Sequence, residues 1–224
     1  MNPKLAQINA HIAGMVNDDL RSHSIRHILK KHFTQNGQER SADWLDNYAE
    51  FIRSYIQFAP GNLATMWNAA NQQGKSAEFE PIAEMLLAYY FKADDQIPDR
   101  LGLWGWLDDA YLSNYTLELI NHKCKEQLGY YLLDFDFSRC NNTVASFLGS
   151  DLQTLQLEAE RTVNKTENWN AVESFAGVLL GGLLLYGLMG GGGNGSYEGS
   201  PGSYSKDTER RIAQITSGTS LYGY

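Results

Sequence analysis

The amino-acid sequence predicts an all-α fold: a multi-helix bundle, then a hydrophobic Gly-containing C-terminal helix, then a flexible tail rich in Gly, Ser and Tyr. Three observations support this fold class. Apolar residues recur at helical spacing over the first 92 residues, no strand pattern appears there, and an uncharged run precedes a glycine tract near the C-terminus. We therefore expect a bundle over 1–174, a hydrophobic helix over 175–189 and a tail over 190–224, whose composition is too poor in apolar residues to fold.

Five apolar stripes mark helices in the N-terminal half. Ser41 is placed to cap the third helix, and Pro60-Gly61 is expected to end it. Gly74 is expected to close the fourth helix, and Pro81 to lie in the first turn of the fifth. The stripes are Leu5, Ile8, Ile12 and Met15; Ile25, Ile28, Leu29 and Phe33; Trp44, Leu45, Tyr48, Phe51, Ile52, Tyr55 and Ile56; Leu63, Met66, Trp67 and Ala70; and Ile82, Met85, Leu86, Tyr89 and Tyr90.

The second half of the chain has weaker signals. An Asp-rich loop is expected over about 93–107, followed by a helix from Asp108 to about Lys123. The segment 130–137 ends in strand-like alternation, but a lone strand has no partner, so we interpret it as a helix that runs into an extended connection. Ser150 and Gln153 fit a capping box before another helix.

The net charge of −8 speaks against a dedicated nucleic-acid binder, so no nucleic-acid partner is expected. Residues 1–40 have an excess of Lys and Arg, whereas 94–173 are acidic. The two cysteines, Cys124 and Cys140, make neither a disulfide framework nor a zinc motif. The N-terminus has no apolar signal-peptide core, so we expect a protein of the cytoplasm or the cytoplasmic face of the inner membrane, not a secreted one.

An acidic segment holds the most specific pattern. Asp95, Asp99, Asp108 and Asp109 fall within fifteen residues that also contain Pro98, Trp104 and Trp106. One interpretation is a rigid corner between helices, in which the later carboxylates favour a helix N-terminus and the tryptophans plug the turn. The other is a metal site, because four carboxylates suit Mg²⁺, Mn²⁺ or Ca²⁺ and would repel one another without a cation or Arg100.

This segment resembles the YkvA-like family, a group of mostly bacterial helical proteins of unknown function. The resemblance covers about 85–120 and implies a small, often membrane-associated helical module, with no catalytic residues to carry over. The chain departs from the pattern at Lys92-Ala93, Asp94, Arg100 and Gly102, which implies a less rigid and more polar loop. The matching residues are Asp95, Ile97, Pro98, Asp99, Gly105, Trp106, Leu107, Asp108 and Asp109.

The run Phe175–Met189 contains no charge and is hydrophobic all round. The run is shorter than the usual span of about twenty residues. Its apolar side chains contribute roughly −2 to −5 kcal/mol to insertion, but its glycines and the flanking polar residues work against this, so insertion is marginal. Its glycines permit close approach of backbones, and two of them have the small-residue spacing of membrane helix pairs. The run is thus either a buried central helix or a membrane-inserting one. The glycines are Gly177, Gly181, Gly182 and Gly187.

His23 and His27 lie one helical turn apart, near Lys30 and Lys31. Their spacing could bind a transition metal, but no third ligand is evident, and a solvated basic face is the favoured interpretation. A face of this kind is also compatible with contact to anionic lipid. The sequence contains no phosphate loop after a strand and no recognisable nucleophile elbow.

The sequence as a whole favours a non-enzymatic helical interaction module at or near a bacterial membrane. Its expected partner is a membrane lipid or a protein, and it requires no cofactor. The alternative is a divalent-metal protein, such as a hydrolase, that uses the Asp cluster to hold Mg, Mn or Ca.

Overall fold

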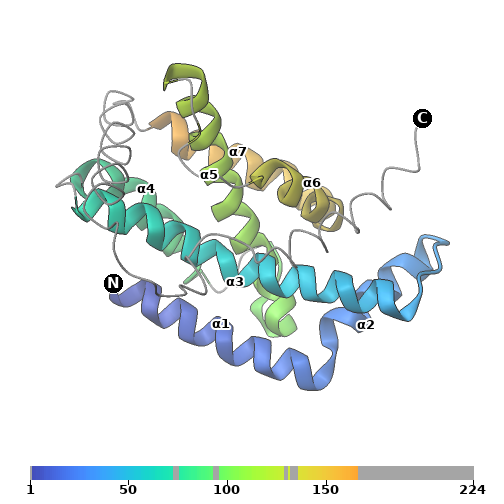
Figure 1. The fold of residues 1–224 in the computed structure, drawn as a ribbon. Coiled ribbons are helices and arrows are strands. Elements are labelled where there is room, and N and C mark those ends of the chain that lie inside the picture. Colours follow the sequence, from blue (N-terminus) through green and yellow to red (C-terminus); the bar gives the residue numbers. More distant parts are fainter. Residues whose placement is uncertain (1, 73–75, 93–95, 129–130, 132–135, 166–224) are drawn as a thin grey trace, which may run out of the picture.

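The computed structural model describes residues 2–72, 76–92, 96–128, 131 and 136–165. This part of the chain is all-α and contains no strand, which confirms the predicted fold class (Figure 1). The expected hydrophobic helix and the tail lie outside the described residues. The elements are α1 (Pro3–Ser22), α2 (Ser24–Gln35), α3 (Ala42–Gln72), α4 (Ser76–Tyr89), the 3-10 helix η1 (Asp99–Trp106), α5 (Leu107–Leu128), α6 (Phe137–Leu148), the 3-10 helix η2 (Gly149–Asp151) and α7 (Leu152–Lys165).

Helix α5 occupies the centre of the described bundle. It crosses α3 and packs also against α4, α6 and α7 (Figure 1). Residues 103–114, which include its first two turns, are all buried. A helix buried on every face must satisfy its polar side chains inside the protein. Asn114 does so by accepting a hydrogen bond at 3.2 Å from the side-chain amide of Asn62 in α3.

Helix α3 continues through Pro60 and Gly61, so the predicted break at these residues is wrong. A proline inside a helix costs about 3 kcal/mol, because it lacks an N–H and crowds the preceding turn. The apolar stripe nevertheless continues beyond it, with Leu63 and Met66 at 0% and 2% exposed. Burial of each such side chain contributes about 1.5–3 kcal/mol, which offsets the cost of the proline. The short helix expected after Pro60 is therefore the C-terminal part of α3.

Helix α4 begins at Ser76, five residues before Pro81, so the prediction of Pro81 in its first turn is wrong. The residues between them include Ala and Glu, which are strong helix formers and extend the helix toward its N-terminus. The predicted apolar face is confirmed, because Ile82, Leu86 and Tyr90 are all buried.

A sharp corner joins α1 to α2 at His23, which has a left-handed backbone with φ 54°. The buried carboxylate of Asp19 accepts hydrogen bonds from the backbone N–H of Ile25 and from Nε of Arg53 in α3, both at 2.8 Å. It also accepts one from the hydroxyl of Ser24. Burial alone would raise the pKa of Asp19, but these hydrogen bonds and the charge of Arg53 outweigh burial and lower it. The carboxylate thus ties three helices together.

Helix α6 was not predicted from the sequence. Its N-cap is Asp136, whose carboxylate accepts the backbone N–H of Arg139 at 3.0 Å. Most of the segment 130–137, which was expected to be a helix that runs into an extended connection, lies outside the described residues. The buried face of α6 consists of Phe137, Cys140, Asn141, Val144 and Leu148.

Candidate functional site

The acidic corner is the turn between α4 and α5, built in the described part of the chain by residues 96–109. Pro98 is extended, with φ −61° and ψ 128°, and Gly102 has φ 67° and ψ −142°. Glycine adopts such a positive φ readily, whereas the ring of proline holds φ near about −65°. The glycine at position 102, where the YkvA-like pattern has proline, therefore permits a turn that proline cannot make.

The carboxylate of Asp108 closes the acidic corner. Its Oδ2 accepts a hydrogen bond at 2.9 Å from the backbone N–H of Ile97, and the residue is 0% exposed. A buried N–H without a partner costs about 1–3 kcal/mol, so this contact stabilises the turn. Asp108 also lies in the first turn of α5, where a negative charge is favoured by the helix dipole. Both contacts favour the structural interpretation of the corner.

Asp109, the next residue after Asp108 in α5, is 2% exposed. Its charge acts on the phenol of Tyr90, which comes from the end of α4. Burial raises the pKa of Tyr90 well above its ordinary value, and the charges of Asp109 and Asp108 raise it further. The nearby hydroxyl of Ser113 lowers it by less. Tyr90 is therefore a neutral phenol that can donate a hydrogen bond inside the core.

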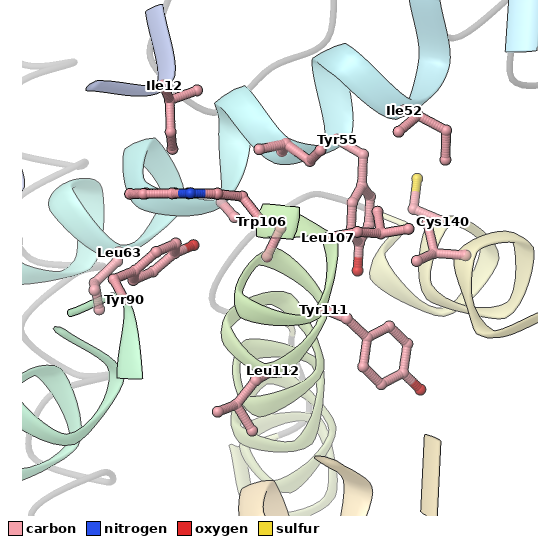
Figure 2. Packing of buried hydrophobic residues seen from close by; sticks show 14 of the residues in the cluster. Ile12, Ile52, Tyr55, Leu63, Tyr90, Trp106, Leu107, Tyr111, Leu112 and Cys140 are labelled. Atoms are coloured by element: carbon pink, nitrogen blue, oxygen red, sulfur yellow. The ribbon is translucent and has the colours of Figure 1, made fainter. Parts of the chain in front are cut away.

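The tryptophans that were expected to plug the corner are buried, at 9% exposed for Trp104 and 5% for Trp106. Trp106 faces Tyr90 with ring centroids 5.8 Å apart (Figure 2), and it also meets the ring of His11 in α1 at 5.0 Å. Trp104 meets Phe147 of α6 edge-on at 5.8 Å. The corner is thus packed against both α1 and α6. The other buried residues of the motif are Ile97, Gly105 and Leu107.

The metal interpretation requires Asp95, Asp99, Asp108 and Asp109 together. Asp108 and Asp109 are neighbours in the first turn of α5, but Asp95 and the side chain of Asp99 lie outside the described part. Among the residues that are described, no group of three or more His, Cys, Asp or Glu is arranged to hold a metal ion. A hard cation such as Ca²⁺ takes about six to eight oxygen ligands. A site for Mg, Mn or Ca here therefore stays a prediction that depends on Asp95 and Asp99.

A second polar cluster, which the sequence did not predict, joins α3, α5 and α6. At its centre, Glu118 accepts hydrogen bonds from the hydroxyl of Ser138 and, at 2.6 Å, from the amide of Asn141. Asn141 in turn accepts one from the hydroxyl of Tyr55 at 2.6 Å. The Nε2 atom of His122 lies 3.4 Å from Ser138 Oγ and 3.9 Å from Glu118 Oε1. The only local signal was the spacing of Glu118 and His122, four residues apart on α5.

This cluster does not have the geometry of a nucleophilic triad. In a triad the imidazole stands between the hydroxyl and the acid, and it contacts them through different ring nitrogens. Here Ser138 donates directly to Glu118, and both residues approach the same nitrogen of His122. The imidazole therefore does not stand between the hydroxyl and the acid, as it does in a triad. The arrangement therefore connects α5 to α6 as a hydrogen-bonded brace.

Helix α2 presents a basic face to solvent, as the sequence predicts. We define the α2 basic face as the exposed residues His23, His27, Lys30 and Lys31. On the flank of the helix, Arg26 forms an ion pair with Asp46 of α3. No carboxylate in the described residues forms a salt bridge with Lys30 or Lys31. The described part of the chain also supplies no cluster that would complete a metal site at His23 and His27.

The predicted packing or membrane glycines Gly177, Gly181, Gly182 and Gly187 lie outside the described residues, as does the whole run Phe175–Met189. Of the helices that are described, none combines the length and apolar character needed to cross a bilayer.

No protein-family model, curated protein or solved structure matches this chain. The likeness of 85–120 to the YkvA-like family is therefore a prediction that rests on the motif residues alone.

Proposed function

We propose that this chain is a non-enzymatic helical interaction module that works at or near a membrane, with a lipid or protein partner. The observation that carries the proposal is the central position of α5. Helices α3, α4, α6 and α7 all pack against it, and its first turns are buried.

The central position of α5 is an argument about the environment of the uncharged run Phe175–Met189. A helix that is apolar on every face belongs in the centre of a bundle or in a bilayer. Because α5 already fills the centre of the described bundle, its position supports a bilayer as the environment of the apolar run. The run has fifteen residues, against the roughly twenty that a full span requires, so we expect marginal insertion.

The polar clusters of the described part support a non-enzymatic role. Asp108 bonds to the backbone of Ile97, and Glu118 bonds to the side chains of Ser138 and Asn141. The carboxylate of Asp108 closes a turn, and that of Glu118 joins two helices. Buried polar groups that are hydrogen-bonded in this way make one packing arrangement of the helices more stable than others, which is a structural role.

Fractionation of cells that express the tagged full-length chain tests the proposal. The protein should sediment with membranes and resist carbonate washing, because salt and alkali remove surface-bound proteins but not inserted ones. Leu184→Arg should make the protein removable by the carbonate wash, since a central arginine costs about 2.5–3.5 kcal/mol on the insertion scale. Leu157→Arg is the matched control, because Leu157 is 43% exposed on α7 and the change should leave fractionation unaltered. Wild-type protein found wholly in the low-salt supernatant would contradict the proposal.

A further inference from the structure

The basic residues of α2 stand out within an acidic chain. The helix contains Arg26, Lys30 and Lys31 but no Asp or Glu, whereas the whole chain has a net charge of −8. Arg26 is neutralised by its ion pair with Asp46. The lysines are exposed and form no salt bridge with a carboxylate of the described residues, so their charges are available to an external partner.

The core holds this charged surface in a fixed orientation. Ile25 and Leu29 lie on the opposite side of α2, and both are 0% exposed. At the N-terminal end, Ile25 is also held by the hydrogen bond from its backbone N–H to Asp19. Helical spacing places Lys30 one turn after His27, so the α2 basic face forms one continuous stripe on the solvent side.

An exposed apolar side chain precedes the α2 basic face. Leu20, in the last turn of α1, is 49% exposed and lies three residues before His23. A basic helix face that follows an exposed apolar side chain in the chain fits a bilayer interface, where cations meet lipid phosphates and an apolar side chain enters the acyl boundary. A nucleic-acid backbone would pair with the lysines but would leave Leu20 without an apolar environment.

We infer that the α2 basic face, together with Leu20, docks on the headgroups of an anionic phospholipid bilayer. This inference rests on the proposed membrane function and deepens it, because it names the lipid class and the contacting surface. Insertion of Phe175–Met189 would depend little on lipid charge, whereas docking through α2 makes binding selective for anionic lipid and sensitive to salt.

Sedimentation of the full chain with vesicles tests this inference. The probes are vesicles of phosphatidylcholine alone and vesicles of phosphatidylcholine with added phosphatidylglycerol. Each lysine near an anionic surface contributes about fivefold in partitioning, so K30Q/K31Q should weaken binding to the anionic vesicles by about 25-fold. Leu20→Ser should weaken it by several-fold, at high salt as well as at low salt, because its contribution is apolar.

The matched control is K4Q/R161Q, which removes the same two charges from exposed side chains of α1 and α7. Lys4 lies at the opposite end of α1 from the α2 corner, about 25–30 Å away for a helix of this length and well beyond a Debye length of about 8 Å. The control should therefore bind anionic vesicles within about twofold of wild type.

The outcomes separate this inference from the proposed function. Equal binding of wild type and K30Q/K31Q to both kinds of vesicle would overturn the inference and leave a membrane role through Phe175–Met189. Failure of the wild type to bind either kind would overturn both. Tighter binding of the wild type to RNA than to anionic vesicles, lost in K30Q/K31Q, would overturn the inference in favour of a nucleic-acid partner.

Discussion

The carboxylate of Asp108 and the backbone N–H of Ile97 are joined by a hydrogen bond of 2.9 Å that bridges the two ends of η1. This contact turns an acidic sequence motif into a buried structural element. It fixes the path of the chain into α5, the helix on which the rest of the described bundle packs.

Replacing Asp108 with Ala should lower the free energy of unfolding by about 1–3 kcal/mol, because the buried N–H of Ile97 loses its acceptor. Urea unfolding followed by circular dichroism measures the change. Asp18→Ala is the control: the side chain of Asp18 is 77% exposed, and its loss should change stability by at most about 0.5 kcal/mol. An Asp108→Ala protein as stable as wild type would show that the contact does not hold the corner.

Two Gly→Ala substitutions should have opposite effects. Gly14 lies in α1, where an added Cβ meets no atom within 4 Å, so Gly14→Ala should stabilise the protein by about 0.5–1 kcal/mol. Gly102 has φ 67°, so Gly102→Ala should destabilise it by at least about 1 kcal/mol. Melting temperatures should therefore move in opposite directions. An increase in both variants would mean that Gly102 does not require its positive φ.

Asp19 should make stability depend on pH in the acid range. Its pKa in the folded protein is lowered, while the pKa of an unfolded Asp is about 3.9. A lowered folded pKa adds stability that is present above about pH 4 and lost as the pH falls through the folded pKa. Asp19→Asn should therefore be less stable than wild type near neutral pH, and the difference should shrink in acid. Urea unfolding across pH checks this, and a difference that is constant with pH would contradict it.

Divalent metals distinguish the two interpretations of the acidic corner. The structural interpretation expects no change in melting temperature when Mg²⁺, Mn²⁺ or Ca²⁺ is added. A metal bound to the folded state would instead raise the melting temperature in a saturable way, by linkage. If such an increase occurs and disappears in Asp99→Asn, the metal interpretation replaces the structural one at this site.

The sequence predicted helices correctly where the apolar spacing is regular, and at the start of α3 the predicted cap agrees with that spacing. Ser41 was expected to cap α3, and its hydroxyl accepts the backbone N–H of Trp44 at 3.2 Å. Pro60 misled the prediction because a local rule about proline was overridden by tertiary burial on both sides of it. The buried residues Phe137, Cys140 and Val144 of α6 do follow helical spacing, but polar residues between them obscured the pattern.

Within the candidate site, the sequence predicted features of a single helix but not the contacts between separate segments. The place of Asp108 in the first turn of a helix followed from the sequence, but its bond to Ile97 depends on how η1 folds back. The bond from Ser138 to Glu118 joins residues twenty positions apart on different helices. Such contacts depend on how whole helices pack, which a pattern of single residues does not specify.

Thermal unfolding of a fragment that ends at Lys165, measured without detergent, tests the central position of α5 most directly. If α5 is the spine of the bundle, the fragment should be soluble, strongly helical and cooperatively unfolding. The full chain, which retains Phe175–Met189, should require membranes or detergent. A fragment that is unfolded or aggregated, beside a full chain that is soluble without detergent, would show that the apolar run belongs to the bundle core and would contradict the account.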